Sequence, residues 1–154
     1  MSRIEIISAD QADREDFSAA RHFVTEFQRV WSAPTVESVN ALLHPQVRLT
    51  QPMEADALGL EATARLWQRL FALVPDIRIE VLHWAARGDR LFMEGRMYGH
   101  FAGAPIAWIV AYNVRLKDGL AIERRAHFDP LAVMRQIARR PSGWLRWMRV
   151  RWFM

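Results

Sequence analysis

Cysteine is absent from this sequence of 154 residues, and its absence limits the kinds of site that the chain can form. Without cysteine there is neither a disulfide framework nor a thiolate metal site, which agrees with a reducing compartment such as the cytoplasm. The N-terminal segment lacks the apolar core of a signal peptide. No stretch approaches the ~18 apolar residues that a membrane-spanning helix needs. We therefore expect a cytoplasmic protein.

Motifs that hold metals or phosphates are missing as well. The five histidines show no HxH or HxxxH spacing, so we expect no metal site. Gly95, Gly99 and Gly103 belong to a predicted strand and its turn rather than to a strand-to-helix junction, so they do not form a phosphate-binding loop. We expect the protein to work without a cofactor.

Acidic residues are absent from one part of the chain only. Residues 130–154 contain six arginines and no acid, whereas the rest of the chain holds all 17 acids and the other 15 basic residues. The net charge of +4 therefore belongs to the C-terminal segment. A nucleic-acid-binding domain normally has a basic stripe across its folded body, so we expect no nucleic-acid partner.

The size and the hydrophobic pattern predict one α+β domain. Apolar spacings of three and four predict helices over about 14–31, 36–43 and 59–74, the second capped by Thr35. Alternation of apolar and polar residues predicts strands over 47–51, 77–86, 90–101, 106–116 and from 120, and Asp129-Pro130 then opens a last helix. Helices followed by an antiparallel meander and a closing helix are typical of an α+β fold.

The stretch from Arg90 to Asp129 forms the centre of this prediction, as three antiparallel strands. Asp118-Gly119 between two apolar runs predicts a two-residue hairpin turn, since glycine tolerates the positive φ that such a turn needs. With Lys117 opposite Leu120, alternate side chains share one face. The predicted inner face carries Met93, Gly95, Met97, Gly99, Phe101, Trp108, Val110 and Tyr112, with Arg125, His127 and Asp129 at one end. A single bulge would exchange some of these assignments.

The opposite face of this sheet is predicted to be wetter. It would collect Glu94, Arg96, Tyr98, His100, Asn113 and Arg124, among the apolar residues Ile109, Ala111, Ile122, Ala126 and Phe128. An apolar outer face on a bent sheet suits a two-fold contact, so we expect a homodimer through this surface.

Three residues at the charged end are the candidate catalytic groups. Asp129 would act as a base if it were partly desolvated, or it would simply cap the helix that follows. His127 would form a proton-transfer pair with it, or would be a core histidine bonded to a neighbour. Arg125 would hold an enolate or a carboxylate, or would be an ordinary solvated or ion-paired arginine. The sequence leaves these alternatives open.

A pocket for a flat, hydrophobic ligand is predicted beside these groups. Its candidate contacts are aromatic or adaptable side chains and one amide: Phe27, Trp31, Trp67, Met97, Trp108, Tyr112 and Gln51. Aromatic residues at helical spacing are also typical of plain core packing.

The segment Pro141–Met154 is dense in tryptophan and arginine. Plotted as a helix, Trp144, Met148 and Trp152 share one side, with Arg151 between them. We favour packing of this tail on its own pocket mouth or on a partner subunit over contact with a membrane surface.

Several segments together resemble the SnoaL-like branch of the nuclear-transport-factor-2-like (NTF2-like) superfamily. They are FQRVWSAP, ALLHPQVRL, GLEATARLWQRLFALVPDIRIEV, GDRLFMEGRMYGHFAG and KDGLAIERRAHFDPLAVMRQI. The resemblance implies a cone in which a strongly bent antiparallel sheet wraps around the N-terminal helices. It implies one domain over 1–140, with 141–154 as a tail.

The resemblance also implies candidate chemistry. In the polyketide cyclases an aspartate near the end of the last strand is the acid/base, and Asp129 matches its position. The ketosteroid isomerase set is incomplete, because Tyr98 is predicted on the outer face and only Tyr112 would serve. The epoxide hydrolases need a second pocket acid, and only Glu123, at the far end, is available.

We therefore predict a cofactor-free enzyme that removes a proton beside the carbonyl of a hydrophobic, polyketide- or steroid-like compound and so cyclises or isomerises it. The alternative is a non-catalytic ligand-binding or assembly module with the same pocket, since this fold serves both purposes.

Overall fold

The computed structural model describes residues 17–153 of the chain and has the predicted α+β architecture. The predicted helix start near residue 14 lies outside the described residues. The helices are α2 (Ser18–Trp31), α3 (Val36–Asn40), α4 (Gly59–Leu73), α5 (Pro130–Ala138) and α6 (Trp144–Phe153), with a short 3₁₀ turn at Pro141–Gly143. The strands are β1 (Leu43–Thr50), β2 (Ala57–Leu58), β3 (Arg78–Arg87), β4 (Arg90–Phe101), β5 (Ala104–Lys117) and β6 (Leu120–His127).

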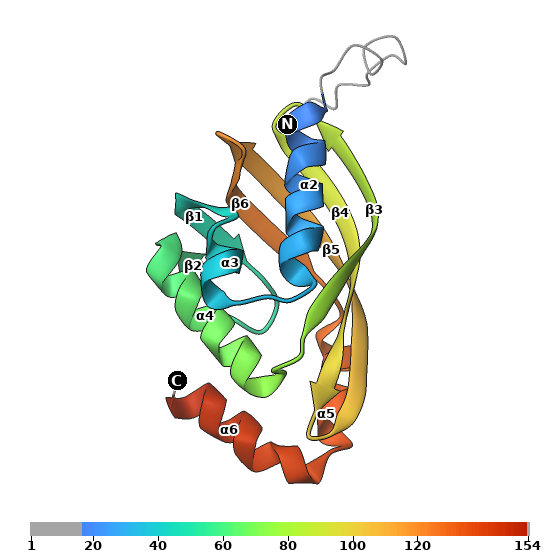
Figure 1. The fold of residues 1–154 in the computed structure, drawn as a ribbon. Helices are drawn as coiled ribbons and strands as arrows, with labels where there is room; N and C mark the ends of the chain where they lie inside the picture. The colour runs from blue at the N-terminus through green and yellow to red at the C-terminus, as the bar shows by residue number, and fades with distance from the viewer. Residues whose placement is uncertain (1–16, 154) are drawn as a thin grey trace, which may run out of the picture.

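One bent sheet of six strands forms the body of the molecule. Its order is β2-β1-β6-β5-β4-β3, and only the β1–β6 pair is parallel. Helices α2, α3 and α4 lie along one face, and α5 and α6 lie at the end of the sheet away from the N-terminus (Figure 1). The hydrophobic core fills the space between these helices and the sheet, as the apolar spacing predicted.

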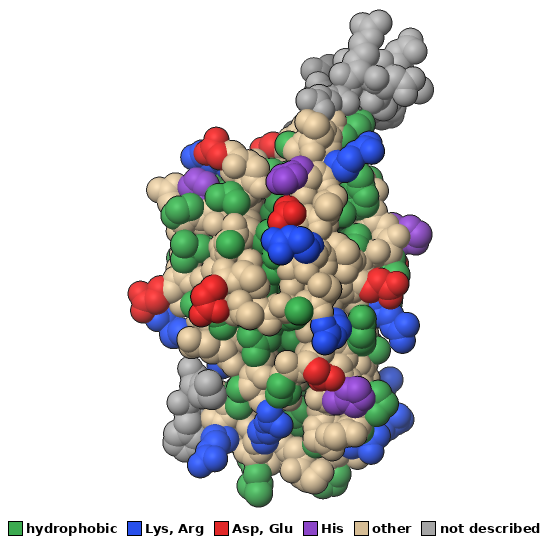
Figure 2. All heavy atoms as spheres, viewed as in Figure 1, with side chains coloured by type: hydrophobic (Ala, Val, Ile, Leu, Met, Phe, Trp, Pro, Cys, Tyr) green, Lys and Arg blue, Asp and Glu red, His purple; other side chains and the backbone are tan. Residues whose placement is uncertain are grey.

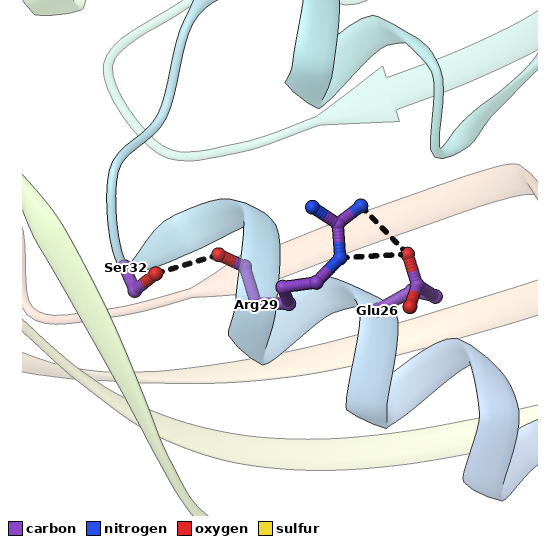
Figure 3. Close-up of polar contacts among 3 residues, drawn as sticks. All are labelled: Glu26, Arg29 and Ser32. Atoms are coloured by element: carbon purple, nitrogen blue, oxygen red, sulfur yellow. Dashed lines mark hydrogen bonds and ion pairs between the residues drawn. The ribbon is translucent and has the colours of Figure 1, made fainter.

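Local sequence explains where the helices begin and which side they bury. The hydroxyl of Thr35 accepts a hydrogen bond from the Ser38 amide at 3.1 Å, and the Ser38 hydroxyl accepts one from the Thr35 amide at 2.9 Å, which is a capping box. In α2 the apolar residues three and four apart face the core, and polar residues cover the other side. On that side Glu26 accepts two hydrogen bonds from Arg29. At the end of the helix the Ser32 hydroxyl donates a hydrogen bond to the Arg29 carbonyl (Figure 3).

The largest correction to the predicted register lies between β5 and β6. Lys117 pairs with Leu120 as predicted, but the register shifts by one residue at Ile122, so that Asn113 pairs with Arg125. Such a bulge moves every later side chain of the strand to the opposite face of the sheet. The predicted inner positions of Arg125 and His127 were therefore wrong: both side chains are exposed on the outer face.

The same shift corrects the predicted outer face of β6. Arg124 and Ala126 are buried on the inner side, opposite Val114 and Tyr112, rather than exposed with Ile109 and Ala111. Phe128 also lies on the inner side, since it borders the cavity described below. On β4 the predicted faces are confirmed, with Glu94, Arg96, Tyr98 and His100 exposed.

The C-terminal tail is a helix that folds back onto the body. Helix α6 runs across the end of the molecule beneath the C-terminal end of α4 (Figure 1). Within residues 17–153, no helix is both long enough and apolar enough to cross a bilayer.

Candidate functional site

A cavity of about 390 Å³ lies between the inner face of the sheet and helices α4, α5 and α6. Its wall is mostly apolar: Met53, Leu70, Leu73, Val74, Met97, Phe101, Ile106, Val110, Ala126, Phe128, Val133, Ile137 and Val150, with the aromatic side chains Trp67, Trp108, Tyr112 and Trp147. The polar residues on the wall are Gln51, Glu54, Arg69, Arg124 and Arg151. This size lies toward the lower end of the range for small-molecule sites.

Arg124 is the buried charge of this cavity, with only 6% of the residue exposed. Its guanidinium carbon lies 5.1 Å from the ring centre of Trp67 and 4.6 Å from that of Tyr112. Among residues 17–153 no carboxylate forms an ion pair with it. Burial lowers the pKa of Arg124, because removal from water disfavours the charged form. The two rings stabilise the charge in part, and an oxygen with negative charge would stabilise it further.

The hydroxyl of Tyr112 lies beside this guanidinium. It donates to the sulfur of Met97 at 3.7 Å, and a thioether is a weak acceptor. Burial raises the pKa of Tyr112, and the positive charge of Arg124 opposes that rise without cancelling it. The indole nitrogen of Trp108 is buried with no hydrogen-bond partner among the described residues. Arg124 and Tyr112 thus place two polar groups side by side on one cavity wall, whereas the Trp108 indole nitrogen is covered.

A second layer of side chains holds this wall in place. The Asn40 side-chain oxygen accepts hydrogen bonds from the Trp67 indole at 3.1 Å and from the Thr63 hydroxyl at 3.0 Å. Phe27 packs edge-on against Tyr112, with ring centres 5.7 Å apart, and Trp31 packs in the same way against Trp67, also at 5.7 Å. The two rings that flank Arg124 are therefore fixed from behind.

Polar residues and α6 form the remaining wall. Glu54 and Arg69 make an ion pair at 2.9 Å, and both side chains are about three-quarters buried. On α6, Trp147 and Val150 line the cavity, while Arg151 lies 3.5 Å from the Met53 carbonyl oxygen. The C-terminal segment, which was expected to pack on its own pocket mouth or on a partner subunit, therefore forms part of the cavity wall.

Five of the seven predicted binding residues line the cavity: Gln51, Trp67, Met97, Trp108 and Tyr112. Phe27 and Trp31 do not, because they form the layer behind Tyr112 and Trp67. Whether any of the seven contacts a ligand remains a prediction.

The three predicted catalytic residues lie outside the cavity. Arg125 and His127 face outward because of the bulge at Ile122. Asp129 is exposed, and its side-chain oxygen accepts a hydrogen bond from the Leu131 amide at 2.9 Å, so it caps α5 as the sequence predicted. Their catalytic roles remain predictions that this geometry does not favour.

Sequence reasoning missed Arg124 and Glu54 as cavity residues. Arg124 was placed on the wrong face, and only the bulge would have revealed it. Glu54 lies in a loop where Met53 has a φ of 71°, a conformation that no periodicity predicts. The described residues contain no cluster of histidine, aspartate and glutamate able to hold a metal ion.

Similar solved structures share this fold. A protein described as a SnoaL-like polyketide cyclase from Jannaschia sp. CCS1 superposes with a TM-score of 0.72 at 22% identity, over 84% of this chain and 99% of that one. A protein with a ketosteroid isomerase-like fold from Catenulispora acidiphila, bound to trimethylamine, gives 0.68 at 18% identity, over 74% and 90%. An LEH-like epoxide hydrolase from M. tuberculosis gives 0.67 at 17%, over 83% and 96%. At these identities the likeness shows the NTF2-like fold.

No protein of curated function matches the chain. The family model of the SnoaL-like domain matches residues 24–124, which is more than half of the chain and runs from α2 to the buried arginine of the cavity. The chain therefore belongs to the SnoaL-like family of NTF2-like proteins.

Proposed function

We propose that this SnoaL-like protein binds a small, hydrophobic carbonyl compound in its cavity and removes a proton from the carbon beside the carbonyl, as a cyclase or an isomerase does. One observation carries the proposal: the guanidinium of Arg124 is buried beside Tyr112 without a carboxylate partner in the described part of the chain. Donors placed in this way in a dry site favour an oxygen on which negative charge develops. The apolar wall suits a fused-ring compound of modest size.

In this mechanism Arg124 and Tyr112 hold the carbonyl oxygen. Glu54, the carboxylate on the cavity wall, takes the α-proton, and the electron pair of the broken C–H bond forms the enolate. In an isomerisation Glu54 returns the proton to another carbon. In a cyclisation the enolate carbon attacks a second carbonyl, and the new alkoxide takes the proton. Both routes return Glu54 to its starting form.

Exchange of α-protons tests the shared first step. The probe is 2-tetralone, a bicyclic ketone, incubated with the full chain in D₂O and followed by loss of its α-proton signals in NMR. We expect exchange above the buffer rate, and a loss of about a hundredfold with Glu54→Gln. The control is Glu61→Gln, which removes a helical ion pair with Arg65 instead. Exchange at the buffer rate, or an undiminished rate in Glu54→Gln, would rule out this mechanism.

A non-catalytic ligand-binding module is the second candidate, and the ion pair of Glu54 with Arg69 favours it. Arg69 donates a hydrogen bond to a carboxylate oxygen of Glu54, and a general base needs that oxygen to be free. Binding of 2-tetralone, detected by quenching of tryptophan emission, without any α-exchange would select this candidate.

We also propose a homodimer through the outer face of the sheet. The support is that Phe92 and Ile109 are about half exposed there, so this face offers apolar area that a two-fold contact would bury. Sedimentation equilibrium should show a dimer for the unaltered chain and a monomer for Ile109→Asp. A monomer in both cases would contradict the proposal.

A further inference from the structure

Helix α6 has two apolar faces: one lines the cavity, and the other is largely exposed, although the Trp144 indole on it donates to the Ile137 carbonyl at 3.3 Å. Trp147 and Val150 face the cavity. The outer apolar face consists of Trp144 (46% exposed), Leu145 (77%), Met148 (43%) and Trp152 (77%). At 3.6 residues per turn these four residues fall within a sector of about 100°, so they form one continuous surface. None of these four residues lines the cavity, so the cavity does not explain why they are apolar.

The surroundings of the outer apolar face are basic. All six arginines of residues 130–154 are exposed, and this segment contains no acid. Arg149 lies on α6 itself, and Arg139 and Arg140 follow directly after α5. At the end of the molecule that α6 crosses, hydrophobic and basic side chains lie next to one another (Figure 2).

The helix is fixed on the body, so its outer apolar face is held outward. A side chain at Gly143 would come within 2.5 Å of the Phe101 ring, which shows how closely the start of α6 packs. Arg146 donates to the Ala72 carbonyl at 2.8 Å, at the end of α4. A rigid apolar surface binds a partner with less loss of conformational entropy than a mobile tail would.

We propose that this face docks on the surface of a membrane that contains anionic lipid. Tryptophan settles at the level of the lipid headgroups, leucine and methionine enter the outer hydrocarbon, and arginines attract the anionic surface. A second copy of the chain is a poorer occupant, because a two-fold contact would bring two arginine-rich segments together. Charge complementarity therefore selects the anionic bilayer.

Docking would also place the cavity beside the bilayer, since α6 contributes both to the cavity wall and to the outer apolar face. A hydrophobic compound dissolved in the membrane would then have a short path to the site. This consequence rests on the proposed function, whereas docking itself does not.

Vesicle co-flotation of the full chain tests docking directly. The vesicles are phosphatidylcholine alone or phosphatidylcholine mixed with phosphatidylglycerol. We expect co-flotation with the mixed vesicles, weakened by salt, and little with the neutral ones. Leu145→Ser combined with Trp152→Ser should lower vesicle binding by at least about tenfold. Leu58→Ser is the matched control, because Leu58 on β2 is similarly exposed (65%) and lies outside α5 and α6.

Several outcomes would overturn the proposal. One is that the full chain floats with neither kind of vesicle. Another is that Leu58→Ser reduces flotation as much as the double variant does. A dimer that the double variant dissociates, without vesicle binding by the unaltered chain, would assign the face to a second copy. If the double variant does not fold, Arg149→Gln with Arg139→Gln decides: unchanged binding to the anionic vesicles would equally end the proposal. Failure of α-exchange with retained flotation would affect the proposed function alone.

Discussion

Arg124 and Arg125 are neighbours in the sequence, yet the fold gives them opposite surroundings. Arg124 is buried between two aromatic rings on the cavity wall, and Arg125 is exposed on the outer face beside Asn113. Adjacent residues of a regularly paired strand point to opposite faces, so one of the two had to face inward. The bulge at Ile122 decides which one it is, and it thereby decides where the charge of the site lies.

The largest expected effect comes from breaking this contrast. Arg124→Met removes the buried charge but keeps much of the volume, and we expect α-exchange of 2-tetralone to fall by about a hundredfold or more. The free energy of unfolding should stay equal or rise, because a buried charge without a carboxylate partner is costly. Rates come from NMR and stabilities from urea unfolding.

Arg125→Met is the matched control for this variant. It should change the exchange rate less than about twofold, since the exposed guanidinium does not line the cavity. Equal losses in the two variants would mean that Arg125 also belongs to the site, as the sequence indicated.

The two tyrosines sharpen the same contrast. Tyr112→Phe removes the hydroxyl beside Arg124, and we expect about a tenfold loss of exchange rate, the worth of one hydrogen bond. Stability should change little, because the hydroxyl donates to the Met97 sulfur, which is a weak acceptor. Tyr98→Phe, on the outer face of β4, should leave both quantities unchanged. If Tyr98→Phe lowered the exchange rate more than Tyr112→Phe does, the site would not be the cavity.

The sequence predicted most elements because their signals are local. The bounds of β4 agree with the prediction at both ends, and the Asp118-Gly119 turn, the Thr35 cap and the Asp129 cap all lie where the sequence indicated. Each depends on residues within a few positions of one another. Local chemistry is therefore sufficient to predict them.

The site was harder to predict because it depends on distant contacts. Both faces of β6 hold an arginine and an apolar or small residue, so alternation alone does not show which face is inward. The bulge depends on pairing with β5 and also with β1. Likewise, the seat of α6 depends on Phe101, Ala72 and Met53, all far away in the sequence.

A smaller effect is expected in the layer behind the cavity. Asn40→Leu would leave the Trp67 indole buried without its acceptor, and we expect a loss of about 1–3 kcal/mol in the free energy of unfolding. Asn113→Ala is the outer-face counterpart, where the side-chain oxygen has no partner among the described residues. It should cost less than about 1 kcal/mol. Urea unfolding measures both variants, and equal losses in the free energy of unfolding would contradict this prediction.

The smallest expected effect is a pH dependence on the outer side. His100 donates to Asp76 through its backbone amide at 2.8 Å, and its ring nitrogen lies 2.6 Å from the other carboxylate oxygen. The contact with the His100 ring, and then the amide, holds the pKa of Asp76 below its ordinary value. The resulting stabilisation is complete above the pKa of the unfolded chain and is lost as pH falls through the lower pKa of the folded state.

Asp76→Asn should therefore lower stability by less than about 1 kcal/mol near neutral pH, because both side chains are half exposed. The difference from the unaltered chain should shrink below about pH 5, as the carboxylate of the unaltered chain takes up a proton. Urea unfolding at several pH values measures this, with His100→Gln as the control that removes the other partner. A difference that grows toward low pH would contradict the assignment. No similar low-pH step is expected from Arg124 and Tyr112, because both keep their protons in acid, so acid sensitivity should separate the outer pair from the cavity.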